Sequence, residues 1–311
     1  MSVRLSVVIP TYNRPDELAR CVAAIAASTV APERYEVIVV NDGGVSPDAA
    51  LLGVARRLNL RVLTQPNRGP GAARNYGAGS ARGELIAFTD DDCIPASGWL
   101  EALERSFNSR PESLHGGRTV NSLGDNPFSQ ASQSLIDYVH RYYNDRSARR
   151  TRFFPSNNIA VSARMFEATG GFDESLRAAE DRDFCRTWHN LGRDFQYIPD
   201  AVVNHAHHLT FGSLQRQHFS YGRGALPYWR KASGKNWSSL KVEPLSFYIG
   251  MLTHPFTENV PNPALIAALI VVSQISNAMG FAYEAVGSHR SPEGLVDAQT
   301  NDQAIEVPSL S

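Results

Sequence analysis

An apolar run over residues 84–89 ends in three adjacent carboxylates, Asp90, Asp91 and Asp92, here called the acidic triplet. The run has the composition of a buried strand, so the triplet is expected at its carboxyl end. Neighbouring negative charges repel one another and lose hydration in a cleft, and a cation must therefore compensate them. Carboxylate oxygens suit Mn²⁺ or Mg²⁺, and we expect Asp90 and Asp92 to hold such an ion. The alternative is an acidic surface turn, since Asp is common in turns and at helix N-caps.

The bulk composition is that of an ordinary globular protein. Its 311 residues are enough for one large domain or two modest ones. The formal net charge of −1 gives no reason to expect a nucleic acid as partner. Cys21, Cys93 and Cys185 are far apart and lack zinc-site spacing, which fits a reducing cytoplasm. The apolar run at residues 5–9 is too short for a signal-peptide core, and we expect it to be a strand.

Strands and helices alternate in the first third of the chain. Strands are expected at residues 5–10, 36–42, 60–65 and 84–89, and helices from residue 15, at 51–58 and at 72–81. Near-continuous apolar strands that alternate with helices predict an α/β protein, with a mostly parallel, Rossmann-like sheet and helices on both faces. Ligands of such sheets bind beyond the carboxyl ends of the strands, where Thr11, Asp42 and the acidic triplet all fall.

The pattern loosens after Pro95. Helices are expected at residues 99–107, 135–143, 165–169 and from 179 to a stop at 192, and strands at 116–120, 158–162, 195–198 and 202–203. A basic stretch at residues 141–152 is typical of a solvated loop, although an anionic acceptor or lipid head groups would also suit it.

The strand ends carry the parts of a mononucleotide pocket but no familiar phosphate loop. A Gly-x-Gly-x-x-Gly fingerprint and a Gly-x-x-x-x-Gly-Lys-Ser/Thr loop are both missing, which disfavours dinucleotide sites and phosphate-loop ATPases. Asp42 can accept a hydrogen bond from a base, Tyr12 offers an aromatic face, and Arg74 can pair with phosphate. For Asp42 the alternative is a turn residue, because Asn-Asp-Gly-Gly is ordinary turn chemistry.

A second acidic pair, Glu180 and Asp181, follows the nucleotide half of the chain. One of them could serve as the general base for an incoming hydroxyl, although a carboxylate that opens a helix is often only its N-cap. His205 could complete the metal shell, because imidazole also binds ions such as Mn²⁺. His207 and His208 stand close to it, and the spacing leaves open which of the three is functional.

These residues resemble family 2 glycosyltransferases with the GT-A fold. The resemblance rests on VIPTYNR at residues 8–14, NDG at 41–43, NRGPGAARN at 67–75, FTDDD at 88–92, GGFD at 170–173 and ED at 180–181. It implies inverting transfer from a nucleotide sugar, with the triplet as the DxD motif for metal and ribose. It assigns Asp42 to the base and the catalytic base to the Glu180–Asp181 pair. The nucleotide-binding residues expected on these motifs are Pro10, Thr11, Tyr12, Arg14, Asp42, Arg74, Asp90 and Asp91.

The expected reaction joins the two acidic groups. A metal at Asp92 would meet the charge on the leaving diphosphate, while Asp181 takes the proton of the acceptor hydroxyl on the opposite face of the sugar. Asn157, Asn158 and Trp188 are candidate acceptor contacts. Two alternatives are a sugar-phosphate nucleotidyltransferase and a non-catalytic module that binds metal or sugar. The first typically needs a glycine-rich, basic loop after the first strand, which residues 11–15 do not supply.

The C-terminal part is expected to be helical. Residues 207–223 resemble the segment that follows the catalytic domain in many bacterial members of the family. Residues 264–282 are apolar but interrupted by polar side chains, which is marginal for a spanning helix and suits a helix packed on the domain or lying on a membrane. We expect a cytoplasmic protein, or one at the cytoplasmic face of the membrane. The expected divisions are 1–95, 96–210, 211–290 and a disordered tail at 291–311.

Overall fold

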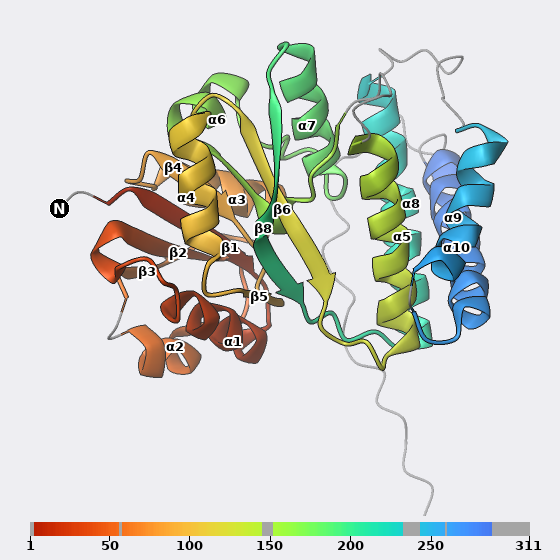
Figure 1. Ribbon diagram of the computed structural model, residues 1–311, viewed down its shortest axis with the longest axis horizontal. Helices are drawn as coiled ribbons and strands as arrows, with labels where there is room; N and C mark the ends of the chain where they lie inside the picture. Colours follow the sequence, from red (N-terminus) through yellow and green to blue (C-terminus); the bar gives the residue numbers. More distant parts are fainter. Residues whose placement is uncertain (1–2, 56–57, 145–151, 233–242, 259, 288–311) are drawn as a thin grey trace, which may run out of the picture.

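The computed structural model describes residues 3–55, 58–144, 152–232, 243–258 and 260–287 (Figure 1). Among these residues, eight strands form one sheet in the order β3-β2-β1-β4-β7-β6-β8-β5. The strands are β1 Leu5–Thr11, β2 Tyr35–Asn41, β3 Leu60–Thr64, β4 Leu85–Phe88, β5 Cys93–Pro95, β6 Leu114–Asn121, β7 Ile159–Ser162 and β8 Phe195–His205. β3, β2, β1 and β4 are parallel neighbours, and β7 and β5 run antiparallel to their partners.

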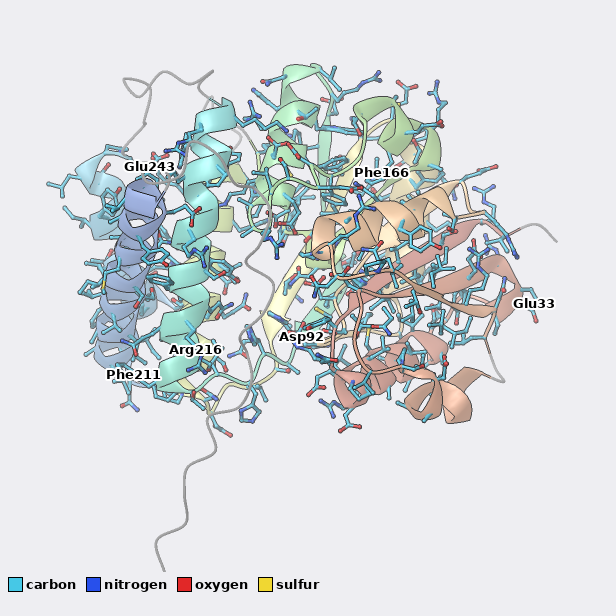
Figure 2. All side chains as sticks on the ribbon, turned by 180° about the vertical axis from the view of Figure 1, so that it is seen from behind. Glu33, Asp92, Phe166, Phe211, Arg216 and Glu243 are labelled. Carbon is cyan, nitrogen blue, oxygen red and sulfur yellow. The ribbon has the colours of Figure 1, made fainter. Side chains whose placement is uncertain are left out.

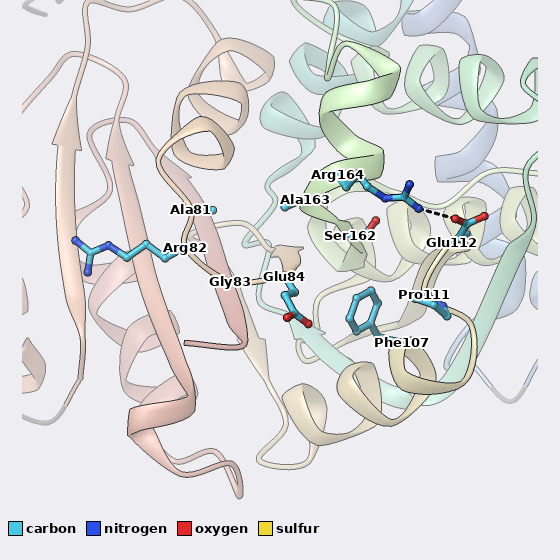
Figure 3. A pocket seen from close by; sticks show the side chains of 10 residues that line it. All are labelled: Ala81, Arg82, Gly83, Glu84, Phe107, Pro111, Glu112, Ser162, Ala163 and Arg164. Carbon is cyan, nitrogen blue, oxygen red and sulfur yellow. Dashed lines mark hydrogen bonds and ion pairs between the residues drawn. The ribbon is translucent and has the colours of Figure 1, made fainter. Parts of the chain in front are cut away.

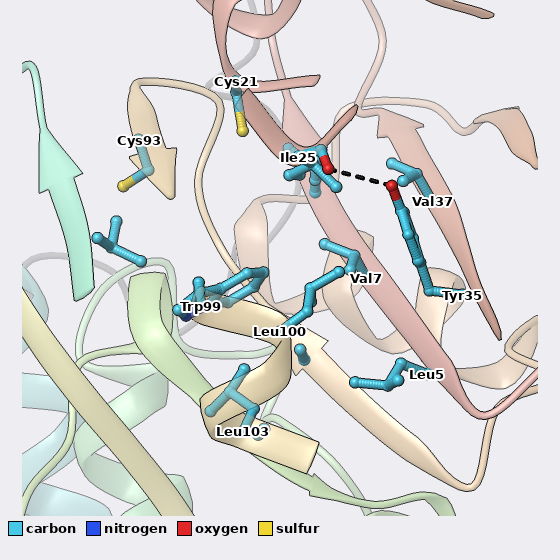
Figure 4. Packing of buried hydrophobic residues seen from close by; sticks show 14 of the residues in the cluster. Leu5, Val7, Cys21, Ile25, Tyr35, Val37, Cys93, Trp99, Leu100 and Leu103 are labelled. Atoms are coloured by element: carbon cyan, nitrogen blue, oxygen red, sulfur yellow. Dashed lines mark hydrogen bonds between the residues drawn. The ribbon is translucent and has the colours of Figure 1, made fainter. Parts of the chain in front are cut away.

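Helices cover both faces of this sheet. The helices of the described residues are α1 Pro15–Ala26, α2 Asp48–Ala55, α3 Pro70–Gly79, α4 Trp99–Ser109, α5 Pro127–Asn144, α6 Ala163–Thr169, α7 Glu180–Asn190, α8 Phe211–Ala232, α9 Leu245–Thr257 and α10 Pro263–Gly287, of which α5 and α8 to α10 lie beside the sheet. On one face, Ile25 of α1 and Trp99 and Leu103 of α4 join a core with β1 and β2 (Figure 4). On the other face, Phe172 and Phe184 pack with Phe88 and the apolar side chains of α6. The predicted α/β fold with helices on both faces is confirmed.

The close approach of α3 to the sheet explains its small residues. A Cβ added at Gly77 would lie 2.4 Å from the Val8 Cγ1 atom and 3.0 Å from the Val40 Cγ2 atom. Only a glycine therefore lets the helix lie this close to β1 and β2. The same approach brings Arg74, one turn earlier in α3, to the carboxyl ends of the strands.

Several expected elements differ from the structure in their bounds, and α5 begins eight residues earlier than expected, at Pro127 and not at 135. Residues 195–205 form the single strand β8, not two short strands, and it stays continuous because a register shift opposite Gly117 and Arg118 absorbs the irregularity. Asn158 belongs to a short 3₁₀ turn, Ser156–Asn158, and not to β7. β4 ends at Phe88, and the Cys93 N–H donates to the Asp90 carbonyl oxygen at 3.1 Å. The acidic triplet therefore lies on a tight turn between β4 and β5.

The C-terminal helices form a separate layer beside the sheet, together with α5 (Figure 1). Their own core contains Leu135 of α5, Leu214 of α8, Met251 of α9 and Ile270 of α10. By length and composition alone, α10 is long and apolar enough to cross a membrane. The expected tail at residues 291–311 and most of the basic stretch at 141–152 lie outside the described residues. The division of the chain near residues 95 and 210 stays a prediction.

Candidate functional site

The acidic triplet meets two residues from the segment that follows β1. The Thr11 hydroxyl donates to Asp91 Oδ2 at 2.8 Å. Arg14 Nη1 lies 3.2 Å from Asp91 Oδ1 and 3.1 Å from Asp92 Oδ2, so one guanidinium nitrogen bridges two carboxylates. Burial raises the pKa of Asp91 to about 6, against the opposing effect of Arg14. Arg14 therefore compensates part of the negative charge at this turn, where the sequence analysis expected a divalent cation.

Asp92 has a second partner at the end of β8. Its Oδ1 atom lies 3.2 Å from His205 Nε2, and both side chains are largely buried. Burial acts to raise the pKa of Asp92, but the hydrogen bond and charge of His205, with Arg14, hold it well below the usual range. Asp92, Cys93 and His205 place their possible ligand atoms within 4.8 Å of one another. Figure 2 shows Asp92 where the sheet approaches the C-terminal helices.

The donor chemistry of this corner fits a divalent cation. A carboxylate and an imidazole converge at Asp92 and His205, and this pair of ligands suits Mn²⁺ and, less well, Mg²⁺. Asp90 lies outside the group of converging ligand atoms, and its Oδ1 accepts from Arg74. The structure therefore brings together two of the three expected ligands.

Arg74 bridges the two acidic groups of the chain. It is 3 % exposed, and its Nη2 donates to Asp90 Oδ1 at 2.6 Å while its Nη1 donates to Glu180 Oε1 at 2.8 Å. We expected Arg74 to pair with phosphate, but both terminal nitrogens already serve carboxylates. Pairing of Arg74 with phosphate stays a prediction, and the sequence pattern gave no signal of the long-range partner Glu180. In this structure Arg74 ties residues 16 and 106 positions away into one cluster.

Glu180 and Asp181 begin α7 in different environments. Ala179 has a left-handed backbone (φ 67°) and is the N-cap residue, so neither acid caps the helix with its side chain. Glu180 is buried, and burial together with the charge of Asp181 raises its pKa to about 7, against the effect of Arg74. Asp181 is partly exposed, and its Oδ2 accepts only a long bond from the Ser156 N–H at 3.4 Å. Burial also raises the pKa of Asp181.

Asp42 fastens the loop that precedes α3. Its Oδ1 accepts from Gln65 Nε2 at 2.7 Å and from the Arg68 N–H at 2.9 Å, and its Oδ2 accepts from the Gly69 N–H at 2.8 Å. This is the loop-forming role of the alternative interpretation, and the contact with a base stays a prediction. Tyr12 is 49 % exposed at the rim, whereas Pro10 is buried within β1.

Two of the three residues expected to contact the acceptor are fully buried and form hydrogen bonds within the fold. Trp188 is fully buried, and its indole N–H donates to the Asp194 carbonyl oxygen at 2.9 Å. Asn158 is also fully buried, and its amide joins Trp99 Nε1 to the Ala201 carbonyl oxygen. Both side chains are engaged within the fold in this structure, and contact of either one with an acceptor stays a prediction. Asn157 is 9 % exposed and accepts from the Thr119 hydroxyl, and its role stays a prediction.

A separate concavity of about 530 Å³ lies at the other end of β4 (Figure 3). It is lined by Arg82, Glu84, Phe107 and Arg164, among others, and Arg164 pairs with Glu112 at its edge. None of the predicted site residues contributes to its wall. The sequence signal that was missed lies elsewhere: Cys93 follows the triplet directly and joins its ligand group, although cysteine spacing alone gave no hint of it.

Comparison with known proteins identifies relatives of this chain. The profile described as "Glycosyl transferase family 2" matches residues 6–169. A pre-mycofactocin glycosyltransferase of Mycobacterium tuberculosis is 31% identical over 227 residues, which are 72% of this chain and 47% of that protein. This chain thus spans about half the length of that relative. Glycosyltransferase AglE of Haloferax volcanii is 27% identical, over 72% of this chain and 74% of its own.

Two groups of solved structures are similar in fold. TarS 1-349 of S. aureus, in complex with UDP-GlcNAc, has a TM-score of 0.52 and 16% identity over 93% of this chain and 92% of its own. Mannosyltransferase PcManGT from Pyrobaculum calidifontis, in complex with GDP-Man and Mn²⁺, has a TM-score of 0.58 and 18% identity over 93% of this chain and 81% of its own. At these identities the likeness shows the fold, which is the predicted GT-A arrangement.

Proposed function

The chain belongs to glycosyl transferase family 2, and on that premise we propose that it moves a sugar from a nucleoside diphosphate sugar to a hydroxyl acceptor, with inversion and with a divalent cation. One observation carries the proposal: Arg74 joins Asp90 of the acidic triplet to Glu180 of the second acidic pair. A group suited to an ion and a group suited to a proton are therefore held together by one guanidinium. The structures solved with UDP-GlcNAc and with GDP-Man and Mn²⁺ support the donor class.

Asp92 and His205 are the residues that would hold the cation, with Asp90 as the third expected ligand. When bound, the ion would act as a Lewis acid that stabilises the charge developing on the leaving diphosphate. Arg14 is the cation best placed to move toward that diphosphate, because its side chain is 48% exposed and its bonds to Asp91 and Asp92 are longer than those of Arg74. Tyr12 and Asp42 would receive the nucleoside.

Asp181 is the proposed general base. Glu180 is engaged by Arg74, whereas Asp181 is held on its Oδ2 side only by the long Ser156 contact and is partly exposed. A raised pKa favours a base that must pick up a proton at neutral pH. Attack by the acceptor hydroxyl on the face opposite the leaving group then inverts the anomeric centre.

The decisive experiment is a panel of nucleotide sugars assayed for release of nucleoside diphosphate with Mn²⁺ and without it. We expect one donor to be turned over in Mn²⁺ and Asp92→Asn to lose that turnover while it keeps its thermal stability. Release of pyrophosphate from a nucleoside triphosphate and a sugar phosphate would instead favour the nucleotidyltransferase. An ion bound without any effect of nucleotide would favour a non-catalytic module.

We also propose that the protein associates with the cytoplasmic face of a membrane through α10. The exposed side of this helix is apolar along its whole length, and its buried side combines Ile266, Leu269 and Ile270 with Ser273 and Ser276. The exposed side chains of that side are Leu265, Val271, Ile275, Met279, Tyr283 and Val286. Residues 230–241 add four basic residues and no acidic ones, which suits anionic head groups.

Co-sedimentation with vesicles tests the membrane proposal. Wild-type protein should pellet with vesicles rich in phosphatidylserine and stay soluble with neutral ones. Ile275→Ser with Met279→Ser should remove that binding, whereas Ala278→Ser on the same helix serves as the matched control. The membrane proposal fails if wild-type protein does not bind anionic vesicles. If the wild type then forms a dimer and the double variant does not, the partner of α10 is a second copy of the chain.

A further inference from the structure

Cys93 lies beside the expected cation site in a way that the catalytic proposal does not use. It is the first residue of β5, and its register partner in β8 is His205, so the two side chains are direct cross-strand neighbours. Its thiol lies 3.9 Å from Asp92 Oδ1, and the possible ligand atoms of Asp92, Cys93 and His205 lie within 4.8 Å of one another. A thiol, an imidazole and a carboxylate thus converge from two paired strands and the turn that connects to one of them.

This donor set differs from one built for Mn²⁺ or Mg²⁺ alone. Mg²⁺ prefers oxygen ligands, whereas thiolate and imidazole ligands favour Zn²⁺ and related ions. Zn²⁺ commonly takes three protein ligands of the Cys, His and carboxylate types and leaves a fourth position open. Zn–S bonds of about 2.3 Å and Zn–N bonds of about 2.0 Å require ligand atoms a few ångströms apart, and the observed group needs only small side-chain movements to meet this.

We propose that Asp92, Cys93 and His205 form a site for a thiophilic divalent cation such as Zn²⁺, which excludes the catalytic ion and so inhibits the enzyme. The ion enters from the side of Asp92 and His205, whose side chains are 10% and 14% exposed, because Cys93 itself is fully buried. Binding forms a metal–sulfur bond and releases the thiol proton to solvent, with no change of oxidation state. The inhibitory role rests on the proposed function, since both ions use Asp92 and His205, but the binding itself does not.

Co²⁺ added to the full-length, chelator-treated protein without nucleotide gives a direct optical test. Co²⁺ replaces Zn²⁺ in such sites, and a thiolate ligand produces a charge-transfer band in the near ultraviolet that oxygen and nitrogen ligands do not. We expect this band in the wild type and its loss in Cys93→Ser. The matched control is Cys21→Ser, because Cys21 is equally buried and bonds the Asp90 carbonyl oxygen but is not part of the ligand group. Figure 4 shows both cysteines in the same core.

His205→Gln keeps the thiol and therefore tests the site even if Cys93→Ser fails to fold. The band should then require a Co²⁺ concentration higher by roughly 100-fold, since even partners outside the ligand shell change metal affinity by about 10- to 100-fold. A wild type without the band, a band that survives in Cys93→Ser, or an unchanged affinity in His205→Gln would each overturn the site.

Zn²⁺ inhibition separates this inference from the proposed function. In the Mn²⁺-supported assay, Zn²⁺ should inhibit the wild type and Cys21→Ser at similar concentrations. If the optical band is present but no nucleotide sugar is turned over in Mn²⁺, the thiophilic site stands and the proposed function fails. If turnover is present and the band is absent, the proposed function stands and the thiophilic site fails.

Discussion

The two acidic groups of this protein differ in how their charge is compensated. In the acidic triplet every carboxylate contacts a basic side chain: Arg74 for Asp90, Arg14 for Asp91, and Arg14 with His205 for Asp92. In the second group Glu180 shares Arg74 with the triplet, and the side chain of Asp181 has no ion pair among those seen in the described residues. Full compensation suits a group that holds charge near an ion. Partial compensation suits a group that exchanges a proton.

The largest effect that this contrast predicts is on Asp181→Asn. If Asp181 is the base, the variant should lose about 10²- to 10⁴-fold in transfer, the usual contribution of a positioned proton acceptor. It should bind the donor and Mn²⁺ almost as the wild type does, because neither contact involves residue 181. Initial rates together with calorimetric donor binding measure both quantities. Loss of donor binding to the same extent would make the pair structural.

Arg74→Met should be the most destabilising change at the junction of the two groups. Removing one partner of a buried ion pair typically costs about 3 to 5 kcal/mol, because a charge is left buried and unpaired. Here Asp90 and Glu180 both lose their partner. Urea unfolding measures the resulting loss in the free energy of unfolding. Arg68→Met is the matched control, since Arg68 pairs with Glu174 at an exposed position and such pairs contribute about 1 kcal/mol or less.

A double variant checks the physical cause of that loss. If Arg74 acts by compensating charge, Arg74→Met combined with Glu180→Gln should recover part of the stability, because one of the two unpaired charges is gone. Equal stability of the single and double variants would show that Arg74 acts by packing against Phe172 instead, whose ring centroid lies 5.7 Å from its guanidinium carbon.

The pH profile gives a smaller effect with a defined sign. Burial and the charge of Asp181 raise the pKa of Glu180 from 4.5 to about 7, so the folded pair retains a proton that the unfolded chain has lost. The stability from this proton is present below pH 4.5 and is lost as the pH rises through about 7. Because burial also raises the pKa of Asp181, transfer should increase with pH as Asp181 loses its proton. Glu180→Gln should remove the stability change, which thermal unfolding at several pH values would detect.

Sequence patterns predicted the fold and the acidic groups because both depend on local signals. The apolar strands β1, β2 and β4 are continuous, the acidic triplet follows the end of β4, and the second acidic pair begins α7, so periodicity and local chemistry located them. The contacts that Arg74 and Trp188 make in the structure were not predicted, for the opposite reason. Their roles depend on partners far along the chain, Glu180 for one and the closing loop at Asp194 for the other. The residue type of an arginine or a tryptophan does not reveal which distant residue it will contact.

The C-terminal half of the sheet shows the same limit. Strand β8 was expected as two short pieces because Pro199 and Asp200 interrupt its apolar pattern. The pairing of β8 with β6 accommodates Pro199 and Asp200 through a register shift. Such a shift depends on both strands together and cannot be read from the sequence of either strand alone. The cross-strand pair of Cys93 and His205 was invisible for that reason, since it exists only once β5 is paired with β8.

Arg14 offers the smallest effect and the most direct test of the contrast between the two groups. It compensates Asp91 and Asp92 through a half-exposed side chain, so a divalent ion competes with it for Asp92. Arg14→Met should therefore bind Mn²⁺ alone several-fold more tightly than the wild type, since the acidic triplet keeps more net negative charge. The same variant should bind nucleoside diphosphate with Mn²⁺ more weakly, because it lacks the cation that reaches the phosphates. Arg20→Met, on the exposed side of α1 and paired with Glu17, is the control that alters only the overall charge. Calorimetry with Mn²⁺ alone and with Mn²⁺ plus nucleotide measures both changes. If Arg14→Met binds Mn²⁺ alone more weakly than the wild type, Arg14 orients the carboxylates for the ion and does not compete with it. The acidic triplet would then need Arg14 both with and without the ion.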